Sequence, residues 1–147
     1  MTTNTTEQSK PFNTPFDSYA CPCDTITGTL AGYDLTARIE RDRVATIDDF
    51  DCHNPDQRVT GCTDDQQARL IAARRAWFND QWFYCGIVIS VSRNGVLIDK
   101  RAASLWGFEC NYPDGDNAYL LDIANELAGE AVARANVERA RIVAALA

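Results

Sequence analysis

The stretch from Trp82 to Tyr112 constrains the fold of this chain more than any other segment. It opens with a nearly unbroken run of β-branched and aromatic residues, 82–92, which is typical of a buried strand. Asn94-Gly95 follows, and both residues tolerate the positive φ angles of a tight two-residue hairpin turn. The apolar run then resumes over 96–99. The stretch therefore predicts an antiparallel hairpin at the centre of a sheet.

Further strands are expected on either side of this hairpin. Residues 103–110 form another apolar run, in which Gly107 indicates a bulge or a close backbone approach. Upstream, residues 33–39 alternate apolar and polar side chains with a period of two, which is typical of a half-buried strand. Residues 44–47 are a candidate short partner strand. Residues 17–32 contain many turn-forming residues, and we assign no strand to them.

Two helices complete the prediction. Thr63 is a good N-cap, with Asp64 and Asp65 in the first turn, for a helix over about 63–79. A second helix is expected over about 117–144, capped by Asp116 or Asn117. The apolar stripe of the first helix consists of Leu70, Ile71, Ala73, Trp77 and Phe78. The pattern predicts an α+β fold: a mainly antiparallel sheet of three to five strands, with one face covered by both helices.

The length of 147 residues fits one domain. Residues 1–16 are rich in Thr, Asn and Ser and are predicted to form a flexible arm, anchored near its end by Phe12 and Phe16. Residues 17–147 are predicted to form the single folded domain.

The charge balance excludes several classes of partner. The chain has 21 acidic and 14 basic residues and a net charge of −7. Duplex nucleic acid and anionic membranes are poor partners for such a chain, because both require a basic surface. The sequence contains neither a signal-peptide pattern nor an apolar run long enough to span a membrane. We therefore expect a cytoplasmic protein with reduced thiols.

An acidic cluster between residues 48 and 65 is the first candidate binding feature. Three interpretations compete: a solvated loop, a site for a hard cation, and a contact surface for a basic groove on a protein partner. The EF-hand pattern is absent, which weighs against the cation. The candidate partner-binding residues are Asp48, Asp49, Asp51, Asp56, Asp64 and Asp65.

The cysteines and the single histidine form the second candidate. Together they could supply zinc with soft and borderline ligands from two loops, although their spacing differs from the common paired C-x2-C pattern. The alternative interpretation is that they are small buried thiols and one loop histidine. The candidate ligands are Cys21, Cys23, Cys52, His53 and Cys62.

Enzymatic function has little support in the sequence. A Cys52–His53 nucleophile is the one catalytic arrangement to consider, and adjacency on an irregular loop does not make a catalytic dyad. Phosphate-binding glycine loops, G-x-S-x-G and H-E-x-x-H are all absent. Cys85 and Cys110 fall on predicted strands, where we expect them to fill the core. Any tryptophan or tyrosine left exposed would suit a protein interface.

Four segments carry a resemblance to other proteins: WFYCGIVISV, NGVLID, ASLWGFE and NAYLLDIANEL. Over about residues 77–131, the chain resembles small, acidic, uncharacterised proteins of phages, plasmids and integrative elements. The resemblance implies an anti-defence factor of the anti-CRISPR or anti-restriction class, which acts by binding. It assigns no functional residues.

The expected function is that of a non-enzymatic accessory protein of a mobile genetic element. It would bind a host defence complex through the acidic loop and exposed aromatics, and would block access of nucleic acid. The partner would be a protein with a basic nucleic-acid-binding surface, with no cofactor and no direct contact to nucleic acid or membrane. The alternative is a small zinc-stabilised cytosolic domain with a structural or regulatory role.

Overall fold

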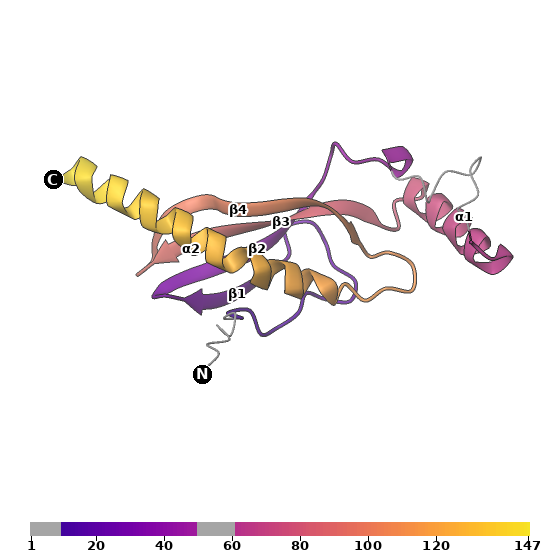
Figure 1. The fold of residues 1–147 in the computed structure, drawn as a ribbon, viewed down its shortest axis with the longest axis horizontal. Coiled ribbons are helices and arrows are strands. Elements are labelled where there is room, and N and C mark those ends of the chain that lie inside the picture. Colours follow the sequence, from indigo (N-terminus) through magenta and orange to yellow (C-terminus); the bar gives the residue numbers. More distant parts are fainter. Residues whose placement is uncertain (1–9, 50–60) are drawn as a thin grey trace, which may run out of the picture.

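The structure is a computed structural model that describes residues 10–49 and 61–147. Four strands form one antiparallel sheet in the order β1-β2-β3-β4, and two α-helices accompany it, which confirms the predicted α+β class (Figure 1). The elements in chain order are β1 (Thr25–Leu30), β2 (Tyr33–Arg41), the 3-10 helix η1 (Ile47–Asp49), α1 (Asp64–Phe78), β3 (Phe83–Arg93), β4 (Val96–Cys110) and α2 (Tyr119–Leu146).

The main core lies between the sheet and α2. Alternate residues of β2 and β3 point toward α2, and Ile39, Ile87 and Ile89 among them are fully buried. The facing positions of α2 are mostly alanines, which allow the helix to approach the sheet closely. These buried α2 residues are Leu120, Ala124, Leu127, Ala128, Ala131 and Ala135.

The predicted hairpin is confirmed, and the strands around it differ in detail. Asn94 and Gly95 have φ angles of 52° and 79°, as a tight turn between β3 and β4 requires. β4 is one strand of 15 residues where the sequence suggested two separate runs. β1 was not predicted. It forms because Ala31 and Gly32 take positive φ and fold it back onto β2.

The expected strand at 44–47 is wrong. The Asp42 carboxylate accepts hydrogen bonds from the backbone N–H groups of Val44 and Ala45, both at 3.0 Å, and turns the chain away from the sheet. Ile47 then opens η1 and is fully buried against the aromatic residues below α1. The segment therefore leads to α1 instead of extending the sheet.

The position of α1 is a second correction. Thr63 is its N-cap, as the sequence predicts, and forms a complete capping box with Gln66. However, α1 lies beyond the end of the strands, so α2 alone of the two helices covers the sheet face (Figure 1). The predicted apolar stripe of α1 is too wide for one buried face. Ala73 is buried, whereas Ile71 and Phe78 are exposed.

The packed domain begins earlier than the predicted boundary at residue 17. Phe12 and Phe16 are 2% and 4% exposed, so the described end of the predicted 1–16 arm belongs to the core. Asn125 of α2 pairs with Phe12 in both directions: it accepts the backbone N–H at 2.9 Å and donates to the carbonyl at 3.1 Å. Asn111 pairs with Ala20 in the same way, with both bonds at 2.7 Å.

Asn117 completes this set of asparagines. Its Nδ2 donates to the backbone carbonyls of Asp17 and Ser18 at 3.1 and 3.2 Å, and its Oδ1 accepts the N–H of Asn111. It therefore does not serve as the expected cap of α2, which has Ala118 at the N-cap position. We call Asn111, Asn117 and Asn125 the asparagine clamp, since together they hold segment 11–20 against the domain.

Candidate functional site

A small apolar cluster, separate from the main core, holds α1 against the end of the sheet. The Trp82 indole is buried and donates a hydrogen bond to the Ala73 carbonyl at 2.8 Å. Its ring meets Tyr84 edge-on, with the ring centroids 5.1 Å apart, and Ile47 belongs to the same cluster. We call the described residues 47–49 and 61–82 the α1 lobe. The cluster fixes the C-terminal half of α1, and Figure 1 shows the lobe projecting from the strand ends.

The outer face of α1 carries large apolar side chains in solvent. Ile71 is 42% exposed and Phe78 is 59% exposed. They are seven residues apart and therefore lie on the same side of the helix. Single exposed apolar residues are ordinary on protein surfaces, and the alignment of these two on a projecting helix makes this face a candidate contact surface.

Arg74 connects this apolar face to a carboxylate. Its guanidinium lies 5.2 Å from the centroid of the Phe78 ring, and its Nη1 lies 2.7 Å from Oδ1 of Asp48. The Asp48 side chain is 68% exposed, so the pair contributes only about 0–1 kcal/mol to folding. Its main effect is to orient Arg74 over the ring and to place a carboxylate at the edge of the apolar face.

The lobe also positions the predicted partner-binding aspartates. Asp49 accepts the backbone N–H of Thr46 at 2.6 Å, which orders η1. By the rise per residue, α1 is about 22 Å long, and carboxylates occur near both of its ends. The four described aspartates of the predicted set are Asp48 and Asp49 in η1, and Asp64 and Asp65 in the first turn of α1. The two that lie outside the described residues are Asp51 and Asp56.

Trp106 is the exposed aromatic on the sheet face opposite α2, and a β-bulge at Gly107 puts it there. The pairing passes from Cys85↔Phe108 to Gly86↔Trp106, so Gly107, with a φ angle of 89°, is the extra residue. Without it, strand alternation would turn Trp106 toward α2. Gly86 provides the space, since a Cβ there would lie 2.3 Å from the Trp106 ring. The sequence indicated a bulge or a close backbone approach at Gly107, and the structure shows the bulge.

A cluster of charges lies next to Trp106. Arg38 and Arg101 form ion pairs with Glu40 at 3.0 and 3.1 Å, and Glu40 is the β2 residue opposite Gly86. Burial raises the pKa of Glu40, but hydrogen bonds from the two guanidinium groups outweigh burial and hold the pKa below the ordinary 4.5. The cluster is therefore charged at neutral pH. With Trp106 40% exposed, this face offers an apolar ring beside fixed charges.

The predicted zinc ligands are only partly within the described chain. Cys21 and Cys23 are exposed in the loop before β1, and Cys62 precedes α1. Within residues 10–49 and 61–147, no three His, Cys, Asp or Glu side chains come together as a metal site. Cys52 and His53 lie outside these ranges. The zinc site and the Cys52–His53 nucleophile therefore stay predictions.

Cys85 and Cys110 occupy the core. Both are fully buried. A hydrogen bond with Cys110, and then burial, raise the pKa of the Cys85 thiol far above its ordinary value. A thiol that stays protonated is a poor nucleophile. The same hydrogen bond lowers the pKa of the Cys110 thiol. The complete burial of both side chains matches the expected packing role.

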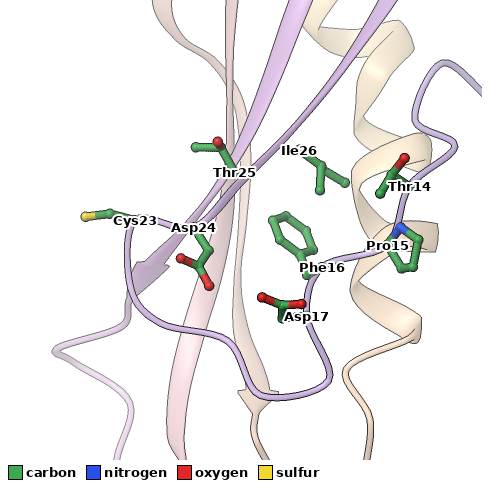
Figure 2. A pocket seen from close by; sticks show the side chains of 8 residues that line it. All are labelled: Thr14, Pro15, Phe16, Asp17, Cys23, Asp24, Thr25 and Ile26. Atoms are coloured by element: carbon green, nitrogen blue, oxygen red, sulfur yellow. The ribbon is translucent and has the colours of Figure 1, made fainter.

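A hollow of about 410 Å³ lies between the 11–20 segment and the start of β1. Figure 2 shows Phe16 and Ile26 side by side in it, with the carboxyl groups of Asp17 and Asp24 near its edge. One of these carboxylates is already engaged, because Asp24 accepts the backbone N–H of Cys21 at 2.8 Å. The sequence could not have revealed this hollow, since it forms only when the asparagine clamp places the segment. It lacks a complete catalytic or metal-binding set.

Comparisons of the chain with protein-family models, with curated proteins and with solved structures find no match. In the described part of the chain, neither helix combines the length and the apolar character needed to cross a bilayer. Two surfaces of the molecule are candidates for binding a partner: the outer face of α1 with its aspartates, and Trp106 on the open sheet face.

Proposed function

We propose that this protein is a non-enzymatic inhibitor encoded by a mobile genetic element and acting in the bacterial cytoplasm. It binds a nucleic-acid-targeting defence complex of the host and blocks the basic surface that receives nucleic acid. The observation that carries the proposal is the outer face of α1, where Ile71 and Phe78 are exposed on a projecting helix that has aspartates in its first turn and in the neighbouring η1.

The chemistry of this face suits such a partner. Protein interfaces place apolar and aromatic groups at the centre and charged groups at the rim. On the α1 lobe, the Phe78 ring and Ile71 supply the centre, and Asp48 and Asp64 lie toward the rim. A net charge of −7 steers the whole molecule toward a positively charged surface and speeds its encounter with it.

Trp106 adds a second exposed aromatic to the proposal. Tryptophan is among the residues most often found at the energetic centre of an interface. The Trp106 ring lies against Gly86, and its Nε1–H donates a hydrogen bond to the Ser104 hydroxyl, with 3.3 Å between the nitrogen and the oxygen. A large partner can contact both the α1 lobe and this ring.

The test is capture followed by competition. The tagged protein is used to capture partners from a lysate of a bacterium that carries an active defence system. The captured complex is then tested for binding to its labelled nucleic acid, with increasing amounts of the purified protein. The proposal predicts a stoichiometric nucleic-acid-binding complex whose binding is lost as the protein is added. A captured complex that binds nucleic acid equally well with and without the protein would contradict it.

A further inference from the structure

The C-terminal end of α2 carries an apolar surface that the domain does not use. The stripe of α2 that packs on the sheet continues from Ala135 to Ile142 and Leu146, at helical spacings of seven and eleven residues. Figure 1 shows these last turns running past the ends of the strands. Leu146 is accordingly 82% exposed. We call residues 134–147 the α2 tip.

The α2 tip is basic although the whole chain is acidic. It contains three arginines and one glutamate. Glu138 is occupied by Arg141 at 3.0 Å and by Arg134 at 3.9 Å. Arg139 forms no ion pair with any residue that the structure describes, and beside it Val143 is 61% exposed. The tip therefore presents free positive charge next to aliphatic side chains, around a shallow hollow of about 420 Å³.

The α1 lobe has the opposite character and lies at the opposite end of the molecule. Its described residues include five aspartates and three arginines, of which Arg74 is already paired with Asp48. Figure 1 shows α1 beyond one end of the sheet and the C-terminal turns of α2 beyond the other. The two ends of one chain are thus complementary in charge, and each exposes large apolar side chains.

From this complementarity we infer that the α2 tip binds the α1 lobe of a second copy of the same chain. The Phe78 ring and Ile71 of one copy pack on Val143 and Leu146 of the next. Arg139 approaches the aspartates of that copy. Charge also selects this head-to-tail contact over a symmetric one, because two α1 lobes, or two α2 tips, would bring like charges together. The contact is heterologous, so each copy keeps one end open for another.

Self-association of this kind goes beyond the proposed function and competes with it. Both uses need Ile71 and Phe78, so a chain that is bound to the next copy cannot dock through the same face. Purified protein alone tests the self-association, whereas inhibition of a defence complex needs that complex. Failure of one proposal is therefore distinguishable from failure of the other.

Two variants, each blocked at one end, test the inference. The lobe variant carries Ile71→Ser and Phe78→Ser, and the tip variant carries Arg139→Glu and Val143→Ser. Leu105→Ser is the matched control, since Leu105 is 45% exposed on β4 and belongs to neither end. Far-UV circular dichroism checks that each variant is folded. Sedimentation velocity over a series of protein concentrations then measures the masses of the species that each protein forms.

We expect the wild type and the control to form oligomers whose size increases with protein concentration. Added salt should dissociate these oligomers, because it screens the charge interactions between copies. Each blocked variant should be monomeric alone. Mixed in equal amounts, the two should form a one-to-one dimer and nothing larger, because one tip and one lobe remain intact. A wild type that stays monomeric throughout would overturn the inference. So would a mixture that fails to pair, which would point to a symmetric contact, or a blocked variant that associates like the wild type.

Discussion

Gly86 on β3 pairs with Trp106 on β4, and the indole ring of Trp106 fills the space above Gly86. Two glycines are needed for this arrangement: Gly107 turns the tryptophan outward, and Gly86 leaves room for it. Glycine within a strand costs conformational entropy and packing. The local backbone is therefore arranged around the outward position of one side chain, as the proposed binding role of Trp106 requires.

Gly86→Ala should be destabilising only while the tryptophan is present. The new Cβ would lie 2.3 Å from the indole, and forcing such a group into a packed site costs about 1–3 kcal/mol. With Trp106→Ala as background, the same change should cost close to nothing. Urea unfolding of the four proteins in this double-mutant cycle measures the coupling. An equal cost of Gly86→Ala in both backgrounds would show that the ring does not depend on the glycine.

The ion pairs of Glu40 predict an acid-sensitive part of the stability. The folded-state pKa of Glu40 is lowered, so its contribution is complete at neutral pH and is lost as the pH falls below 4.5 toward the folded-state value. Glu40→Gln should therefore reduce the free energy of unfolding at pH 7, and its difference from wild type should shrink in acid.

Urea unfolding at pH 7 and at about pH 3 measures this dependence. Glu126→Gln is the matched control, because Glu126 is exposed on α2. A Glu40→Gln difference that stays constant over the range would contradict the ion-pair account.

Among the elements, the 11–20 segment is one whose position could not be predicted from the local sequence pattern. It has no periodicity of its own, and its position is set by Asn111, Asn117 and Asn125, which are about 100 residues away in the chain. Such side-chain pairing with a distant backbone leaves no local signal. In contrast, the Asn94-Gly95 turn and the Thr63 cap depend on neighbouring residues, so the sequence predicted both correctly.

Two of the errors in placing elements have identifiable physical causes. β1 depends on a tight turn at Ala31-Gly32, which a segment with many turn-forming residues concealed. For α1, helical periodicity was correct, but it could not show which residues face inward. The packing of Trp82 against Ala73 decides that, and it leaves Ile71 and Phe78 outside. The sequence therefore predicted which kinds of residue α1 contains, but it could not predict which of them form its exposed surface.

Removing one member of the asparagine clamp should release the N-terminal segment. Asn125→Ala leaves the buried N–H and carbonyl of Phe12 without their partner, at a cost of about 1–3 kcal/mol for each unpaired group. We expect a lower free energy of unfolding together with faster hydrogen exchange at the Phe12 amide. Glu126→Ala, at an exposed neighbouring position, should leave both unchanged. Normal protection of the Phe12 amide in Asn125→Ala would contradict this role.

At the scale of the whole molecule, one sheet carries two projecting elements of opposite charge. α1 and the α2 tip lie beyond its two ends (Figure 1). Trp106 pairs with Gly86 and lies on the sheet face opposite α2. Apart from Val44 and Tyr19, which lie in loops, the large apolar side chains that are more than half exposed lie where a partner can reach them: Val137, Val143 and Leu146 at the α2 tip, Phe78 at the end of α1, and Val96 and Leu97 at the hairpin. This arrangement suits a protein that acts by contact.

The measurement that tests the central claim most directly is capture of the defence complex by matched variants. Ile71→Ser/Phe78→Ser changes the outer face of α1, and Asp48→Asn/Asp49→Asn removes charge from its rim. Val96→Ser/Leu97→Ser makes a comparable change on the hairpin, where both side chains are more than half exposed. We expect the apolar α1 variant to lose capture and inhibition, the aspartate variant to weaken both, and the hairpin variant to retain them. Full capture and inhibition by the folded apolar α1 variant would contradict the claim.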